Sequence, residues 1–168
     1  ALPGFDKATD DCLPPAVRRH TRAPRDIVIL EGWCIGVPPQ DSEALNDPVN
    51  SLEAREDADG RWRRHVNERL ADDYQALFAC IDYLIMLQAP SFDCVLAWRS
   101  LQEAKLAAKQ SAGHSAGSGI MTPDAIKRFI QHYERLTRHA FATLPDQADA
   151  ILRLDADHRI CASIYKVH

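Results

Sequence analysis

Short apolar runs alternate along the chain with stretches in which apolar residues recur every three or four positions. The runs lie at residues 27–30, 83–87 and 148–154. The first reads Ile-Val-Ile-Leu, with three β-branched residues in succession, which is typical of a strand buried on both faces in a parallel sheet. We predict a strand at each run, the second also buried, and a short final strand over residues 160–165.

The stretches with the longer period predict helices over residues 61–78 and 91–110. A shorter helix is expected to begin within residues 48–53, with Asn50 or Ser51 as its cap. The segment Asp-Ala-Asp-Gly that follows contains poor helix formers. We therefore expect this segment to separate the short helix from the first long one.

A third long helix is expected after residue 121. Thr122 is a suitable N-cap, and Pro123 would take the first helical position, where its missing N–H leaves no hydrogen bond unmade. Pro145 is expected to end this helix. Before it, residues 111–119 are only Ser, Ala, Gly and His, so we expect a mobile loop or a lid there.

Strands and helices in this order predict an α/β fold with a parallel sheet. The length of 168 residues predicts a single domain over residues 1–168. Residues 1–25 contain four prolines, so we expect loop there rather than regular elements.

Composition narrows the class of protein. With 46% hydrophobic and 26% charged residues and a net charge of −4, a globular protein without the basic face of a nucleic-acid binder is expected. No apolar run approaches the roughly 20 residues that span a membrane, and the N-terminus shows no signal-peptide pattern. The five cysteines are odd in number and form no C-x-x-C pair, which indicates reduced thiols and a cytoplasmic location.

Glu31 follows the first predicted strand directly. In open α/β sheets, ligands bind beyond the carboxyl ends of the strands, so a carboxylate there is placed to act on a ligand, often through Mg²⁺. The alternative is that Glu31 caps a loop or pairs with a nearby arginine.

Several segments, taken together and in order, resemble the glycerate kinase-type members of the P-loop kinase superfamily, which are relatives of uridine kinase, phosphoribulokinase and pantothenate kinase. The resemblance covers nearly the whole chain. The segments are Phe5-Asp-Lys-Ala-Thr-Asp-Asp11, Asp26-Ile-Val-Ile-Leu-Glu-Gly-Trp-Cys-Ile-Gly36, Pro48-Val-Asn-Ser-Leu-Glu53, Gly60-Arg-Trp-Arg-Arg-His-Val-Asn67, Ala89-Pro-Ser-Phe-Asp-Cys-Val-Leu-Ala-Trp-Arg99, Gln102-Glu103 and His132-Tyr-Glu-Arg-Leu-Thr137.

The resemblance implies ATP- and Mg²⁺-dependent phosphoryl transfer to a hydroxyl of a small acceptor, D-glycerate or a similar molecule. Catalysis of this kind is mostly positioning and charge neutralisation. By the resemblance, Glu31 matches the acid at the end of the Walker B-like strand, near Mg²⁺ and the reacting phosphate. Asp6 and Lys7 match the catalytic loop that approaches the acceptor.

The resemblance also assigns residues 91–140 to the lid and the helix that follows it. Arg99 lies in the part that closes over the phosphates of the nucleotide, and Gln102 and Lys105 are weaker candidates for the same contact. The alternative for Arg99 is a pair with Glu103, four residues further along the helix.

One family motif does not occur in these residues. The phosphate-binding sequence G-x-x-x-x-G-K-[ST] is not found among them, and in the family it precedes the segment matched by the start of this chain. The chain therefore resembles the C-terminal part of such a kinase, either a fragment or a natural protein without its nucleotide loop, and is not expected to be a competent kinase alone. The alternative function is a non-catalytic binding or interaction module, which could self-associate through an exposed sheet edge.

Overall fold

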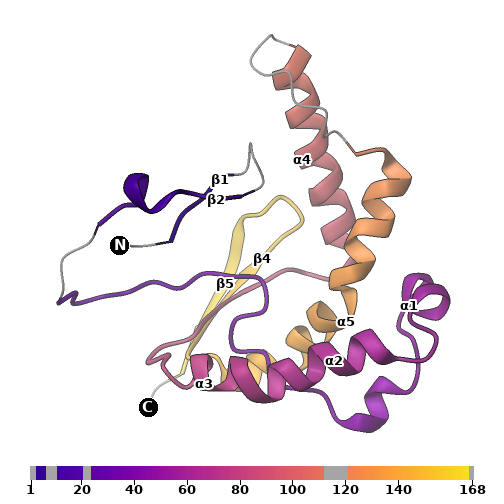
Figure 1. Cartoon of the computed structure of the whole chain (residues 1–168), viewed down its shortest axis with the longest axis horizontal. Coiled ribbons are helices and arrows are strands. Elements are labelled where there is room, and N and C mark those ends of the chain that lie inside the picture. The colour runs from indigo at the N-terminus through magenta and orange to yellow at the C-terminus, as the bar shows by residue number, and fades with distance from the viewer. Residues whose placement is uncertain (1–2, 7–10, 21–23, 112–120, 167–168) are drawn as a thin grey trace. The chain divides into compact units, whose positions relative to one another are not determined.

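The computed structural model describes residues 3–6, 11–20, 24–111 and 121–166 (Figure 1). Its contacts divide the chain into two units, Ala1–Gly32 and Trp33–His168, which are described separately. The prediction of a single domain over the whole chain stays a prediction.

The first unit contains little regular structure. The strands β1 (Phe5–Asp6) and β2 (Asp11–Cys12) pair in antiparallel fashion, and a 3-10 turn covers Pro15–Val17. The prediction that residues 1–25 are entirely loop is therefore wrong in this detail. The hairpin is very short, because each strand has only two residues.

The strand predicted at residues 27–30 does not form. These residues have no strand assignment, and Ile27, Val28 and Ile29 are 80%, 83% and 86% exposed. An apolar, β-branched run becomes a strand only when a neighbouring strand accepts its backbone hydrogen bonds. Among the described residues, no strand pairs with this run.

The second unit contains the α/β fold that the pattern predicted. Its elements in chain order are the 3-10 turn Ser42–Leu45, α1 (Ser51–Glu56), α2 (Arg61–Arg69), a π-helical turn (Leu70–Tyr74), α3 (Gln75–Phe78), β3 (Ile85–Gln88), α4 (Asp93–Ser111), α5 (Pro123–Gln147), β4 (Ala150–Leu154) and β5 (Ile160–Tyr165).

The sheet of this unit has the order β3-β4-β5. β3 and β4 run parallel, as expected for strands joined through helices, but β5 returns antiparallel beside β4. The sheet is therefore mixed rather than wholly parallel. A connection of a few residues between β4 and β5 permits only an antiparallel hairpin, since a parallel crossover needs a dozen or more residues.

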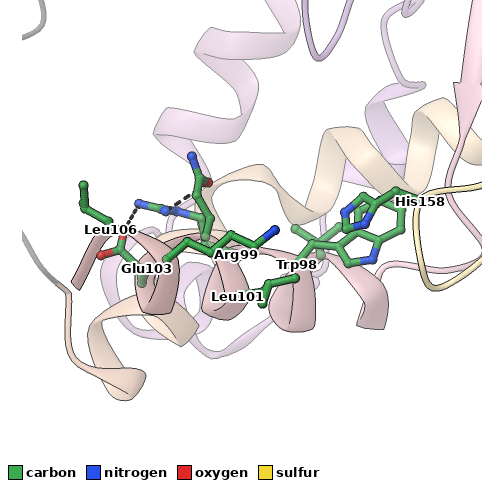
Figure 2. A pocket seen from close by; sticks show the side chains of 9 residues that line it. Trp98, Arg99, Leu101, Glu103, Leu106 and His158 are labelled. Atoms are coloured by element: carbon green, nitrogen blue, oxygen red, sulfur yellow. Dashed lines mark hydrogen bonds and ion pairs between the residues drawn. The ribbon is translucent and has the colours of Figure 1, made fainter. Parts of the chain in front are cut away.

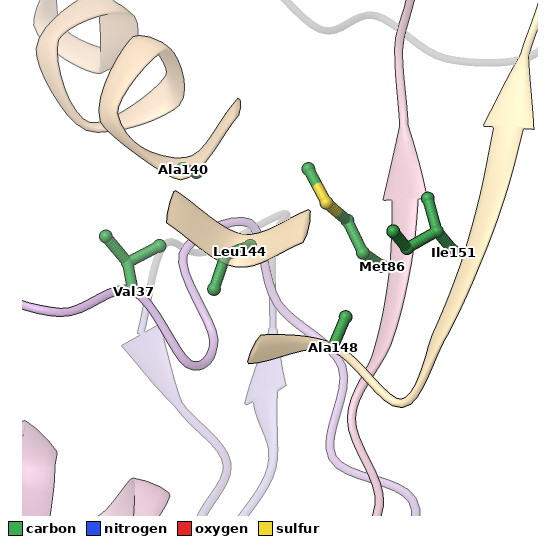
Figure 3. Close-up of a cluster of buried hydrophobic side chains, with 6 residues drawn as sticks. All are labelled: Val37, Met86, Ala140, Leu144, Ala148 and Ile151. Atoms are coloured by element: carbon green, nitrogen blue, oxygen red, sulfur yellow. The ribbon is translucent and has the colours of Figure 1, made fainter. Parts of the chain in front are cut away.

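A cluster of buried side chains joins one face of the sheet to the C-terminal half of α5 (Figure 3). Met86 and Ile151 occupy paired positions on β3 and β4, and Leu144 meets them from the helix. On the other face of β3, Ile85 is 55% and Leu87 is 63% exposed. The second apolar run is thus buried on one face and not on both, because α5 covers only that face.

The N-terminal half of α5 contributes Ile126 and Ile130 to a second cluster with Phe92, the residue before α4, and Val95 and Leu96 of α4 pack against this cluster. The cap of α5 is confirmed: Thr122 Oγ1 accepts a hydrogen bond from Ala125 N at 3.2 Å, and Pro123 begins the helix. Pro145, however, lies inside the helix, which continues to Gln147. One missing N–H in the last turn is tolerated, because the bond from Ala148 N to Leu144 O still closes the helix at 2.8 Å.

The separation of α1 from α2 also follows the prediction, with Asn50 capping α1 through bonds from Leu52 N and Glu53 N. Within α2 the burial is unexpected. Trp62 is 70% exposed, whereas Arg63 is buried. Arg63 donates to Asp57 Oδ2 at 3.2 Å and to the carbonyl oxygens of residues 45, 46 and 57.

The Asp57–Arg63 pair should make stability depend on pH. Burial alone would raise the pKa of Asp57, but the N–H groups of Trp62 and Arg63 and the Arg63 guanidinium bring that pKa below its usual value. A carboxyl with a lowered pKa in the folded state stabilises the fold above its unfolded pKa of about 4, and this contribution is lost as the pH falls below that value.

Asp57→Asn should therefore cost about 3–5 kcal/mol of unfolding free energy at pH 7 in urea titrations, because it leaves a buried guanidinium without its counter-ion. The control is Asp73→Asn, whose pair with Arg69 is exposed and should contribute less than about 1 kcal/mol. Equal losses in the two variants would contradict this account.

Candidate functional site

A cavity of about 750 Å³ lies along one side of α4 (Figure 2). Arg99, Gln102 and Lys105, the three residues expected to contact a nucleotide, all line it. They recur at three-residue intervals and so follow one side of the helix. His158, from the turn between β4 and β5, is the lining residue that does not come from α4. The structure thus brings the predicted nucleotide-binding residues together on one surface.

Arg99 is held by three neighbours. One guanidinium nitrogen lies 2.5 Å from Glu103 Oε1, another donates to Gln102 Oε1 at 3.0 Å, and the group lies over the Phe129 ring, 5.4 Å from its centroid. The pair with Glu103 that the sequence left open as the alternative is confirmed. It does not remove Arg99 from the cavity, because 21% of the side chain remains exposed.

Lys105 supplies a second positive charge to the same cavity. Its residue is exposed, and its lysine ammonium can serve as a point charge for an anion. The cavity therefore combines one arginine that is held in place with one lysine between one and two turns further along the helix.

Aromatic rings form another part of the cavity wall. The rings of Trp98 and His158 are 4.1 Å apart between centroids, with 30° between their planes (Figure 2). Trp98 Nε1 donates to Ala156 O at 2.7 Å, so the indole is fixed to the β4–β5 turn. The sequence pattern alone did not single out His158. The turn sequence Asp-Ala-Asp-His between two strand patterns was the available signal, because histidine is among the residues that tolerate left-handed backbone.

His158 is held in an uncommon backbone conformation, with φ of 65°. Asp155 supports it: the Asp155 carboxylate accepts from the N–H groups of Asp157 and Arg159, both at 2.9 Å, and Asp155 O accepts from His158 N at 3.2 Å. The turn therefore fixes the position of the imidazole against Trp98.

The other predicted site residues are not brought to this cavity by any described contact. Glu31 belongs to the first unit and is exposed. Asp6 lies in β1, but its side chain is outside the described part of the chain, as is Lys7. The loop predicted at 111–119 also lies outside it, except for Ser111, which is the last residue of α4. Their roles remain predictions.

Trp33, the first residue of the second unit, is anchored within that unit. Trp33 Nε1 donates to Thr137 Oγ1 at 2.8 Å, and its ring meets Tyr133 edge-on at 4.9 Å. Tyr133 therefore serves in packing within the second unit.

A second cavity of about 380 Å³ lies between α1, α2 and α5. Its two buried arginines are already paired: Arg63 with Asp57, and Arg135 with Glu53 at 2.7 Å. Arg135, which lies in one of the segments of family resemblance, is therefore structural. His132 also lines this cavity but is exposed.

No group of three or more His, Cys, Asp or Glu side chains suited to a metal ion occurs among the residues that the structure describes. Mg²⁺ needs fewer, because it is commonly bound through one or two carboxylates together with substrate phosphates. The exposed carboxylate of Glu31 has the oxygen chemistry that fits such a site. In the same described part, no helix is long and apolar enough to cross a membrane.

Comparison with solved structures defines the class of fold. The chain superposes on D-glycerate 3-kinase from Cryptococcus neoformans with a TM-score of 0.69 and 22% identity, over 98% of this chain and 59% of that one. It superposes on the YGR205w protein with a TM-score of 0.67 and 23% identity, over 99% and 58%. The chain thus has the α/β fold of the P-loop kinases, as its motifs suggested.

One protein that is similar in sequence is also named as a kinase. The chain is 36% identical over 112 residues to the uncharacterized kinase mug58 of Schizosaccharomyces pombe, an alignment that covers 63% of this chain and 35% of that protein. No family model matches the sequence. The chain spans about a third of the length of this relative and about three fifths of the two structural neighbours.

The backbone of His158 can be tested by substitution. His158→Val should be less stable than His158→Asn by about 1–2 kcal/mol, because a β-branched residue tolerates a positive φ poorly and asparagine tolerates it well. Both variants lack the ring that stacks on Trp98. The difference between their free energies of unfolding in urea therefore reports the effect of the backbone conformation alone. Equal stability of the two would mean that the turn relaxes and does not hold His158 as described.

Proposed function

We propose that this chain takes part in ATP-dependent phosphoryl transfer to a hydroxyl group of a small molecule, with D-glycerate as the first acceptor to test. The observation that carries the proposal is the single cavity that combines Arg99, Gln102 and Lys105 with the stacked rings of Trp98 and His158. The kinase relatives support this assignment.

The charged part of the cavity wall suits the phosphates of a nucleotide, and the aromatic part suits its base. Arg99 and Lys105 can neutralise phosphate charge, and guanidinium and ammonium groups are the usual protein donors to phosphate. The flat faces of Trp98 and His158 can accept a base by stacking. Phosphoryl transfer relies mainly on holding the phosphates and balancing their charge, and the cavity offers groups for both tasks.

Glu31 is proposed to hold the metal ion near the reacting phosphate, while Asp6 and Lys7 face the acceptor. When bound, Mg²⁺ would supply charge neutralisation to the phosphates. Glu31 is exposed, so its carboxylate is open to a ligand. The free state of all five cysteines supports a reducing compartment such as the cytoplasm.

The function is tested by coupled ATP consumption with D-glycerate, pantothenate and uridine as separate acceptors. We expect activity with D-glycerate only in a polypeptide that also includes a G-x-x-x-x-G-K-[ST] segment, if one is encoded upstream, and little or none in these 168 residues, whose sequence has no such loop. Inactivity of both polypeptides with all three acceptors would favour the alternative of a non-catalytic binding module.

In the active polypeptide, Glu31→Gln should lower kcat by about two to three orders of magnitude, the size of effect seen when one group that stabilises developing charge is lost. The melting temperature should change little, because Glu31 is exposed. Glu68→Gln, another exposed acid, is the matched control and should leave both unchanged. A large loss of melting temperature with turnover intact would make Glu31 structural.

A further inference from the structure

Glu103 is an acid in the wall of a cavity proposed to bind an anion. Its residue is only 4% exposed. Two donors reach its carboxylate: Arg99 through the 2.5 Å ion pair, and Met121 N at 3.1 Å. Like charge next to phosphate would weaken binding, so the position of Glu103 needs a reason other than direct contact with the ligand.

We infer that Glu103 is a positioning residue: it holds one edge of the Arg99 guanidinium, on the Phe129 ring, so that the remaining N–H donors face the cavity. This inference rests on the proposed function for the identity of the anion, a nucleotide phosphate. Guanidinium has five donors in a rigid plane. Fixing one edge of that plane determines where the others point, which a flexible arginine in water does not achieve.

Stability alone does not account for this pair. Buried ion pairs are often no more stabilising than apolar residues of similar volume, because both charges lose their hydration. On a helix, an acid four residues before a base is more favourable than the reverse. Arg99 precedes Glu103, so the pair has the less favourable of the two orders.

The chain contains a second pair that serves as a matched comparison. Glu134 of α5 is also buried, pairs with Arg138 at 2.7 Å and accepts from Asn50 Nδ2 at 3.1 Å. The Arg138 guanidinium lies 5.2 Å from the Phe92 ring centroid, much as Arg99 lies over Phe129. This pair has the favourable order and does not line the cavity of α4.

The contact with Met121 extends the role of Glu103 from α4 to α5. Met121 N immediately precedes the Thr122 cap, so a single carboxylate fixes both the cavity arginine and the start of the neighbouring helix. The position of the Arg99 side chain is thereby fixed relative to both α4 and α5, and not to α4 alone.

The first test is the order of the Arg99 side chain in this chain without any ligand, measured from its Nε–H resonance by ¹⁵N relaxation. Glu103→Gln keeps the size of the side chain but removes the charge, and we expect the Arg99 side chain to become clearly more mobile than in the wild type, although Gln102 and Phe129 still contact it. Glu134→Gln should leave Arg99 unchanged. An Arg99 side chain that stays equally ordered in Glu103→Gln overturns the inference, whatever the protein binds.

The second test measures binding of MgATP and of tripolyphosphate by calorimetry to wild type, Glu103→Gln, Arg99→Gln and the double variant. Positioning predicts that Glu103→Gln weakens binding about tenfold, as expected for loss of one well-oriented charged contact, and that it has no further effect when Arg99 is already replaced. If Glu103 only repelled the phosphates, Glu103→Gln would instead strengthen binding. Tighter binding by Glu103→Gln, or an equal loss in the Arg99→Gln background, contradicts the inference.

The two tests separate this inference from the proposed function. If the order of Arg99 depends on Glu103 but neither probe binds the wild type, the positioning role stands and the proposed nucleotide site is wrong. If ATP is consumed with D-glycerate while Glu103→Gln leaves both the order of Arg99 and the nucleotide KM unchanged, the kinase function stands and the inference is wrong.

Discussion

The guanidinium of Arg135 connects the long helix α5 to the segment that precedes and includes α1. It is 7% exposed, donates to both carboxylate oxygens of Glu53 at 2.7 and 2.8 Å, and reaches the carbonyl oxygens of Ala44 and Asp47. Burial would raise the pKa of Glu53, but Arg135 and the N–H of Val49 lower it. The carboxylate therefore stays ionised, and each nitrogen of the buried guanidinium has at least one acceptor, as a buried charge requires.

From that fixed point α5 organises the rest of the second unit. Its C-terminal half presents Ala140 and Leu144 to the sheet, and its N-terminal half presents Ile126 and Ile130 to α4. Its long amphipathic stripe is enough to explain how one helix contacts three different neighbours. The place of α4, and so of the cavity, follows from this packing.

The candidate site depends on contacts between elements that are far apart in sequence. Trp98 reaches Ala156 across 58 positions, and Glu103 reaches Met121 at the start of the next helix. Each contact fixes a group beside the cavity, the indole in one case and the arginine in the other. The charges of the cavity come from α4, whereas the turn between β4 and β5 supplies its imidazole.

Local signals in the sequence determined the helices, their caps at Asn50 and Thr122 and the strands near the C-terminus, because propensity, periodicity and capping act over a few residues. The motifs also pointed correctly to the kinase fold, whereas the nucleotide contacts of Arg99, Gln102 and Lys105, which line one cavity, stay a prediction. Tertiary structure decided the rest. The apolar run at 27–30 stayed unpaired, since a strand needs partners that its own residues cannot supply. Arg63 became buried because carbonyl groups of other segments accept its hydrogen bonds. His158 joined the site because its turn meets the indole of Trp98, a contact between distant residues that no local pattern contains.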